Sequence, residues 1–204
     1  MRYEIATLTL GLGTAAKAVA GIDAWVKDSA AKGTLVGCWM SEVGQLNQVS
    51  VFRSFADQAE LEAERCRART STNPFNAGEA IKEMDFDSYV PFPFCPPVKP
   101  GKFGPVYEIR TYRLKHGGLQ PTIAAWEAAV PERVKISPLI IAMSSIDGPS
   151  RITHIWAYPG HDARIAARAE SVAKGIWPPK GGPDWLTGDM RSTVALPAAI
   201  SPLT

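Results

Sequence analysis

The amino-acid sequence predicts an α+β protein in which two tandem modules share the element order β-α-β-β-α-β. One observation behind this prediction is a repeat, because "YEIATLTLGLGT" at Tyr3–Thr14 has a counterpart in "YEIRTYRLKHGG" at Tyr107–Gly118. The other is that the same succession of strand, helix and turn patterns follows each copy. A repeat that keeps one element order indicates a duplicated folding unit.

In the first copy, residues 3–10 alternate as a half-buried strand does, and Gly11–Gly13 end that strand. Thr14 can cap the helix that follows, in which apolar residues recur at spacings of three and four. The residues expected on the buried face of this helix are Val19, Ile22 and Val26, with Trp25 beside them. Strands are expected next at 35–43 and 49–55.

Asp57 and Glu60 have the spacing of a capping box and predict the start of the second helix of the first copy. After a loop rich in Asn, Pro and Gly comes "FDSYVPFPFCPPV" at residues 86–98. Its prolines predict a short strand at the edge of a sheet.

The second copy repeats this order, with strands expected at 107–114, 139–146 and 152–158. The buried stripe expected in its first helix is Ile123, Trp126, Val130 and Val134, and Pro131 is expected to kink or break that helix. Asp147–Gly148 is a hairpin signal. The second helix is marked by Ile165, Ala169, Val172 and Ile176, and "ALPAAISPLT" closes the copy.

Each copy is therefore a ferredoxin-like unit, an antiparallel sheet with both helices on one face. The bare face of one sheet can be covered by the bare face of the other, which predicts a pseudo-dimeric α+β barrel. The expected modules are 1–98 and 105–204, with "PPVKPGKFGP" at 96–105 between them. The alternative is two independent domains with solvated sheets.

The segments "YEIRTYRLKHG", "LNQVSVFRSF" with its counterpart "SRITHIWAY", and the terminal "SPL" resemble the NIPSNAP family. The resemblance covers nearly the whole chain and implies a duplicated module of the dimeric α+β barrel type. It implies roles in protein interaction or trafficking and brings no catalytic residues. The wider barrel superfamily includes cofactor-free monooxygenases, haem-degrading enzymes and lyases, but fold does not imply function.

Composition excludes several classes of protein. The net charge of +2 is too small to make nucleic acid the expected partner, and no apolar run is long enough for a membrane span.

The chain has three cysteines, Cys38, Cys66 and Cys95, an odd number without CxxC spacing, so reduced thiols in a cytoplasmic protein are expected. The strand pattern begins directly after Met1 and Arg2, without a signal peptide. Proline-blunted edges and apolar residues on the helices predict a homo-oligomer.

The stretch from Gly11 to Ala16 matches the G-x-G-x-x-A fingerprint of dinucleotide sites, after a strand and at the start of a helix. The second copy has "KHGGLQ" at this place, and an antiparallel hairpin follows instead of a parallel strand. The glycines are therefore interpreted as a tight turn, and no cofactor is expected.

The candidate ligand-binding residues are Arg110 and Tyr112 on the first strand of the second copy, and His154 and Trp156 on its third strand. These strands are neighbours in a ferredoxin-like sheet. If this face looks into the barrel, a small anionic or phenolic ligand between the sheets would meet them. The alternatives are a core histidine with one partner and long side chains that reach water. The first copy has other residues at the equivalent positions, namely Ala6, Leu8, Val51 and Arg53.

Two functions follow from these residues. The first is a non-catalytic module that binds a small ligand or another protein, and the alternative is a cofactor-independent monooxygenase or related small-molecule enzyme. Convergence of Arg110, Tyr112 and His154 on one pocket distinguishes the two functions, because an enzyme needs polar groups that meet in one cavity and loses its best support if they diverge. No catalytic residue is assigned. His116 and His161 are expected in solvent, and without clustered ligands no metal site is expected.

Overall fold

The computed structural model describes all residues of the chain, 1–204. The first module comprises β1 (Arg2–Leu10), α1 (Ala15–Val26), β2 (Thr34–Val43), β3 (Gln48–Phe55), α2 (Gln58–Thr70), the 3₁₀ turn η1 (Pro74–Asn76) and β4 (Ile81–Pro91). The second comprises β5 (Val106–Leu114), α3 (Leu119–Arg133), β6 (Leu139–Ser145), β7 (Arg151–Tyr158), α4 (His161–Ala173), η2 (Pro183–Trp185) and β8 (Leu186–Pro197). The predicted order of elements is confirmed in both copies.

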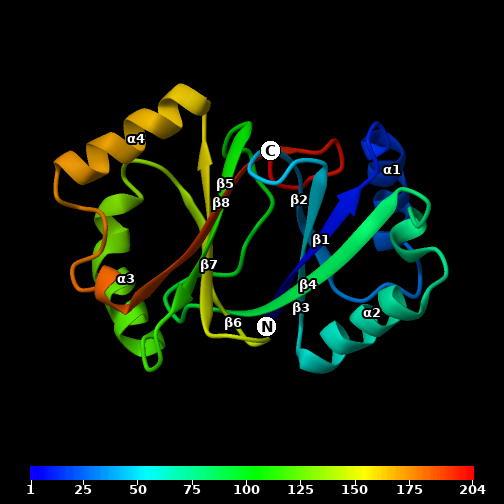
Figure 1. The fold of residues 1–204 in the computed structure, drawn as a ribbon, viewed down its shortest axis with the longest axis horizontal. Coiled ribbons are helices and arrows are strands. Elements are labelled where there is room, and N and C mark those ends of the chain that lie inside the picture. Colours follow the sequence, from blue (N-terminus) through cyan, green and yellow to red (C-terminus); the bar gives the residue numbers. More distant parts are fainter.

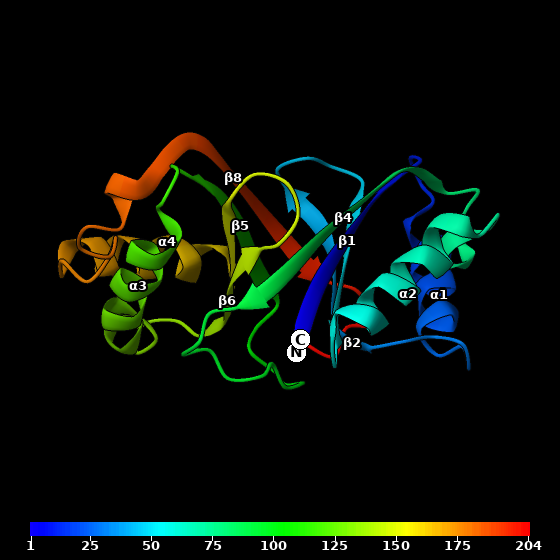
Figure 2. The same cartoon turned by 90° about the horizontal axis from the view of Figure 1, so that it is seen from below.

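The eight strands close into one antiparallel barrel in the order β1-β3-β2-β8-β5-β7-β6-β4. Each module supplies four neighbouring strands, and the two sheets join where β2 pairs with β8 and where β4 pairs with β6. Helices α1 and α2 cover the outside of one sheet, and α3 and α4 cover the outside of the other (Figures 1 and 2). The pseudo-dimeric α+β barrel predicted from the repeat is confirmed.

The strand β4 differs from the short edge strand that its prolines predicted. It begins at Ile81, pairs with β1 along its length and ends at Pro91. Its last residues, Tyr89–Pro91, pair with Met143–Ser145 of β6 in the other module. Because the barrel is closed, no strand edge remains for the prolines to protect.

The turn between β1 and α1 uses a glycine with positive φ, and its counterpart does the same. Gly13 has φ +76° and Gly117 has φ +75°, a backbone conformation that favours glycine. The equal angles at equivalent positions explain the glycines of both copies as turn residues.

Two helices of the second module depart from the expected pattern. Pro131 does not break α3, which continues to Arg133, because the proline lies in the last turn, where it removes a single backbone donor. In α4 the apolar residues Ile165 and Val172, which mark the helix in the sequence, are each 60% exposed and do not form its buried face. Its buried positions are Ala167 and Ser171. Val134 is exposed as well, and Arg133 is buried instead.

The barrel interior is apolar at one end and polar at the other. At the apolar end the sheets bury large side chains against each other, among them Tyr3, Trp39, Phe52 and Tyr107. The segment 92–105 between the modules is fixed by the C-terminus, since Gly101 and Leu203 form an isolated parallel bridge. No helix of the chain is both long enough and apolar enough to span a bilayer.

Candidate functional site

The four predicted ligand-binding residues do come together, but under the helices. Arg110 of β5 lies directly opposite His154 of β7 in the sheet. Together with Tyr112 and Trp156 they line a cavity of about 60 Å³ that also touches residues of α3 and α4. The expectation that this face looks into the barrel is wrong. Residues 107, 109 and 111 take the inward positions instead, where Tyr107 fills the apolar end of the barrel.

His154 is buried and only half satisfied. Its Nδ1 accepts a hydrogen bond from the indole Nε1 of Trp156 at 2.8 Å, so the neutral ring carries its proton on Nε2. This Nε2 has no partner in the chain. The ring packs edge to face against Tyr112 and lies 4.7 Å from the ring of Trp126. Burial, reinforced by the charge of Arg110, lowers the pKa of His154 to about 3.

The carboxylate of Glu108 anchors the arginines of this site. It accepts from Arg164 at 2.5 Å and from Arg110 at 2.9 Å, and Arg168 lies 3.3 Å away. Burial alone would raise the pKa of Glu108, but the hydrogen bond from Arg164 and the arginine charges outweigh burial and lower the pKa to about 2. Glu108 is therefore ionised at neutral pH.

A fourth arginine reaches the cavity from the C-terminal end of α3. The guanidinium of Arg133 lies over the ring of Trp156, 4.5 Å from its centroid, and donates to Ser137. Its Nε, like the Nε of Arg110, is buried without a partner. Three guanidinium groups thus pair with the carboxylate of Glu108, a fourth lines the same cavity, and positive charge is in excess.

Sequence reasoning missed three of these four arginines. Arg164 and Arg168 stand four residues apart on α4, the spacing at which two side chains share a helix face. That spacing was the available signal, but the apolar residues of α4 pointed to the opposite face. Arg133 carried no signal, because Val134 was expected at the buried position.

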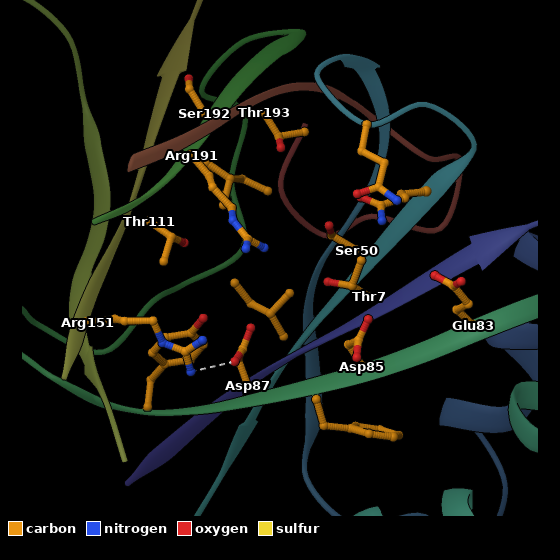
Figure 3. A pocket seen from close by; sticks show the side chains of 16 residues that line it. Thr7, Ser50, Glu83, Asp85, Asp87, Thr111, Arg151, Arg191, Ser192 and Thr193 are labelled. Carbon is orange, nitrogen blue, oxygen red and sulfur yellow. Dashed lines mark hydrogen bonds and ion pairs between the residues drawn. The ribbon is translucent and has the colours of Figure 1, made fainter. Parts of the chain in front are cut away.

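A separate and larger cavity lies inside the barrel, at its polar end (Figure 3). Its volume is about 620 Å³, and strands of both modules form its walls. None of the four predicted residues lines it. The space between the sheets therefore exists, but with other walls, chiefly Thr7, Asp85, Asp87, Thr111, Arg151 and Arg191.

No group of three or more His, Cys, Asp or Glu side chains lies close enough together to hold a metal ion. The thiol of Cys38 is buried, and burial raises its pKa to about 12.

Comparison with known proteins gives the family. A family model described as NIPSNAP matches residues 3–96 and again residues 107–202. The chain belongs to the NIPSNAP family. A protein NipSnap homolog from Dictyostelium discoideum is 26% identical over 147 residues, which are 70% of this chain. The match covers 65% of the length of that relative.

Solved structures share the fold of this NIPSNAP protein. A provisionally assigned monooxygenase from Lactobacillus acidophilus superposes with a TM-score of 0.67 at 13% identity, covering 96% of this chain and 93% of its own. An anthrone oxidase-like protein gives a TM-score of 0.68 at 12% identity, with 98% and 93% covered. At these identities the likeness concerns the fold alone.

Proposed function

We propose that this NIPSNAP protein is a binding protein that holds a small anion, a carboxylate or similar oxyanion, in the cavity under α3 and α4. Arg110 would pair with the anion, His154 would donate to it through Nε2, and Tyr112 and Trp156 would wall it. The observation that carries this proposal is the excess of arginines over carboxylates around a buried imidazole N–H without a partner. Such a donor is costly to bury unless something accepts from it.

The first module supports this proposal because it carries an anion of its own. There Glu64 of α2 is buried and accepts from Trp25, Arg53 and Arg67. Helices α2 and α4 begin at equivalent residues, after Asp57 and Gly160, so the position of Glu64 corresponds to Ala167. The second module thus lacks the carboxylate that neutralises the arginines of the first.

The size of the cavity limits the ligand. About 60 Å³ admits a molecule of a few heavy atoms, or the head group of a larger one. One side leads to solvent, because Arg168 on that side is 43% exposed. Acetate, formate and inorganic phosphate are therefore suitable probes.

Binding is favoured over catalysis by the state of the titratable groups. A general base works best when its pKa lies near the working pH. The pKa of His154 is about 3, and burial raises the pKa of Tyr112. Both side chains are thus neutral hydrogen-bonding groups at neutral pH.

A cofactor-independent monooxygenase is the second candidate. It is favoured by the aromatic walls around His154 and by the fold shared with a provisionally assigned monooxygenase and an anthrone oxidase-like protein. Oxygen consumption with a hydroxynaphthalene as probe, lost in His154→Gln, would favour this candidate over the binding protein.

Calorimetric titration tests the proposed function. Acetate, formate and phosphate are titrated at constant ionic strength into the wild-type chain and into Arg110→Gln and His154→Gln. We expect saturable binding of at least one anion and a loss of affinity of about tenfold or more in Arg110→Gln, because a hydrogen bond to a charged group is worth about 1.5–3 kcal/mol. Arg113→Gln is the matched control, since Arg113 is an exposed arginine on the same strand. Absence of saturable binding, or equal affinity in Arg110→Gln, would overturn the proposal.

A further inference from the structure

The cavity inside the barrel takes no part in the proposed anion site, and its dimensions suit a ligand of its own. Ligand cavities are typically about 300–1,000 Å³, and this one measures about 620 Å³. Ile5, Tyr89 and Ile109 border it on the side of the apolar core. Around them the walls carry hydroxyl and charged side chains from both modules, as Figure 3 shows.

Opposite charges occupy equivalent positions of the two modules in this cavity. Asp85 of β4 pairs with Thr7 of β1, and Arg191 of β8 pairs with Thr111 of β5, at the same place in the repeat. In the closed barrel β4 and β8 are four strands apart in either direction and thus face each other. A barrel made of two identical modules would present the same charge twice. The single chain presents one acidic wall and one basic wall.

These charges are not used within the chain. Asp87 is paired with Arg151 at 2.8 Å, which neutralises that part of the wall. None of the ion pairs or side-chain hydrogen bonds of the structure involves Glu83, Asp85 or Arg191. In Figure 3 the guanidinium of Arg191 points from β8 toward the middle of the cavity, and the side chains of Asp85 and Glu83 project from β4.

We propose that the barrel cavity is a second binding site, for a small zwitterion of the amino-acid type. The ammonium group would lie against Asp85 and Glu83, and the carboxylate would lie against Arg191. The side chains of Thr7 and Thr111 line the cavity beside these charges, with the hydroxyl of Thr111 hydrogen-bonded to that of Thr153 at 2.8 Å. A single charge would use one wall and leave the other unpaired, and an apolar molecule would strip water from both walls without replacing it. The proposal does not depend on the anion site under α3 and α4.

The test is a titration of the full-length chain with glycine, 4-aminobutyrate and 6-aminohexanoate, with butyrate and butylammonium as ligands of one charge. It is made in the Arg110→Gln variant, so that the anion cavity does not contribute. We expect at least one zwitterion to bind about tenfold tighter than either ligand of one charge, because it keeps both charged contacts. Asp85→Asn and Arg191→Gln should each weaken its binding by about tenfold.

A double charge exchange sharpens the test. Because the two positions are equivalent and opposite, the variant that combines Asp85→Arg with Arg191→Asp should bind the same zwitterion within about threefold of the parent, in the reverse orientation. Equal affinity for butyrate or for butylammonium would reduce the cavity to a site for one charge and overturn the proposal. So would absence of saturable zwitterion binding, or full binding in both single variants. An unchanged melting temperature in the variants would show that the barrel is intact.

Discussion

Glu4 in the first module and Glu108 in the second are equivalent residues, both buried between sheet and helices, yet their surroundings differ. Around Glu4 the charges balance, because Arg53 and Arg65 bind it and Glu64 and Asp147 share the same arginines. Around Glu108 the arginines have no second carboxylate.

The comparison shows what a duplication within one chain permits. One copy fills its sheet–helix interface with an internal ion network, in which Arg67 also lies over the ring of Trp25 at 3.6 Å. The other copy keeps the same glutamate but has Ala167 where the first has Glu64, and Trp156 where the first has Arg53. The first copy thus fills the space under its helices with paired charges, whereas the second keeps a cavity there. The two copies also differ inside the barrel, where Asp85 of the first and Arg191 of the second occupy equivalent positions.

The largest effect that could break this comparison is expected from Glu64→Ala. The substitution removes one of the two carboxylates that bind Arg53, which is 1% exposed, and leaves Arg53 to share Glu4 with Arg65. Removing one member of a buried ion pair costs about 3–5 kcal/mol, and the free energy of unfolding in urea should fall by that amount. Alanine is a better helix former than glutamate, so a loss of helix propensity does not contribute.

Glu62→Ala is the matched control for this variant, because Glu62 is an exposed glutamate on the same helix. It should change the free energy of unfolding by less than about 0.5 kcal/mol. A loss below about 1 kcal/mol in Glu64→Ala would mean that the first module does not depend on its internal anion.

The second effect concerns pH and the second module. The pKa of His154 is about 3 in the folded chain, against 6.5 for an ordinary histidine. As pH falls below 6.5, His154 binds a proton in the unfolded chain but stays neutral in the folded chain. The free energy of unfolding therefore decreases by up to about 1.4 kcal/mol per pH unit. Between pH 6.5 and 4.5 the loss should be about 2–3 kcal/mol.

Two titratable neighbours of His154 do not titrate in that interval, since the pKa of Glu108 is about 2 and burial raises the pKa of Tyr112. The stability held by Glu108 is present above its ordinary pKa near 4.5 and is lost as pH falls toward about 2, a lower window. Urea unfolding of His154→Gln should therefore show a flatter pH profile than the wild type. His161→Gln, an exposed histidine of α4, should keep the wild-type profile. Equal slopes in wild type and His154→Gln would contradict the assignment.

The order of elements could be predicted from the repeat, but the facing of the strands could not. Alternation along a strand separates two sets of side chains without saying which set lies inside. Here both faces of each sheet are buried, one under helices and one in the barrel, so Tyr107 and Glu108 are equally inaccessible. The sequence could predict that Arg110 and His154 lie on the same face, because paired residues of neighbouring strands point to the same side of the sheet. It could not predict whether that face lies under the helices or inside the barrel.

The apolar pattern of α4 did not indicate which face of the helix is buried, for a related reason. Hydrophobic periodicity selected Ile165 and Val172, whereas the sheet below presents the carboxylate of Glu108 and needs cations above it. Arg164 and Arg168 meet that need and cover the apolar surface with their stems. A pattern that counts only apolar residues cannot find a helix face chosen by a buried charge on another element.

The smallest expected effect sharpens the comparison most, because it converts the second module into the first. Ala167→Glu places a carboxylate where Glu64 stands in the first module, beside the unbalanced arginines. The new charge should abolish anion binding in the calorimetric titration, and its pairing should outweigh the cost of packing a larger side chain. We expect the free energy of unfolding to rise by about 1 kcal/mol. Ala167→Gln is the matched control, with nearly the same volume and no charge, and it should destabilise the chain. If Glu and Gln at this position change stability alike, the space under α4 is a packing feature and the excess of arginines does not call for an anion.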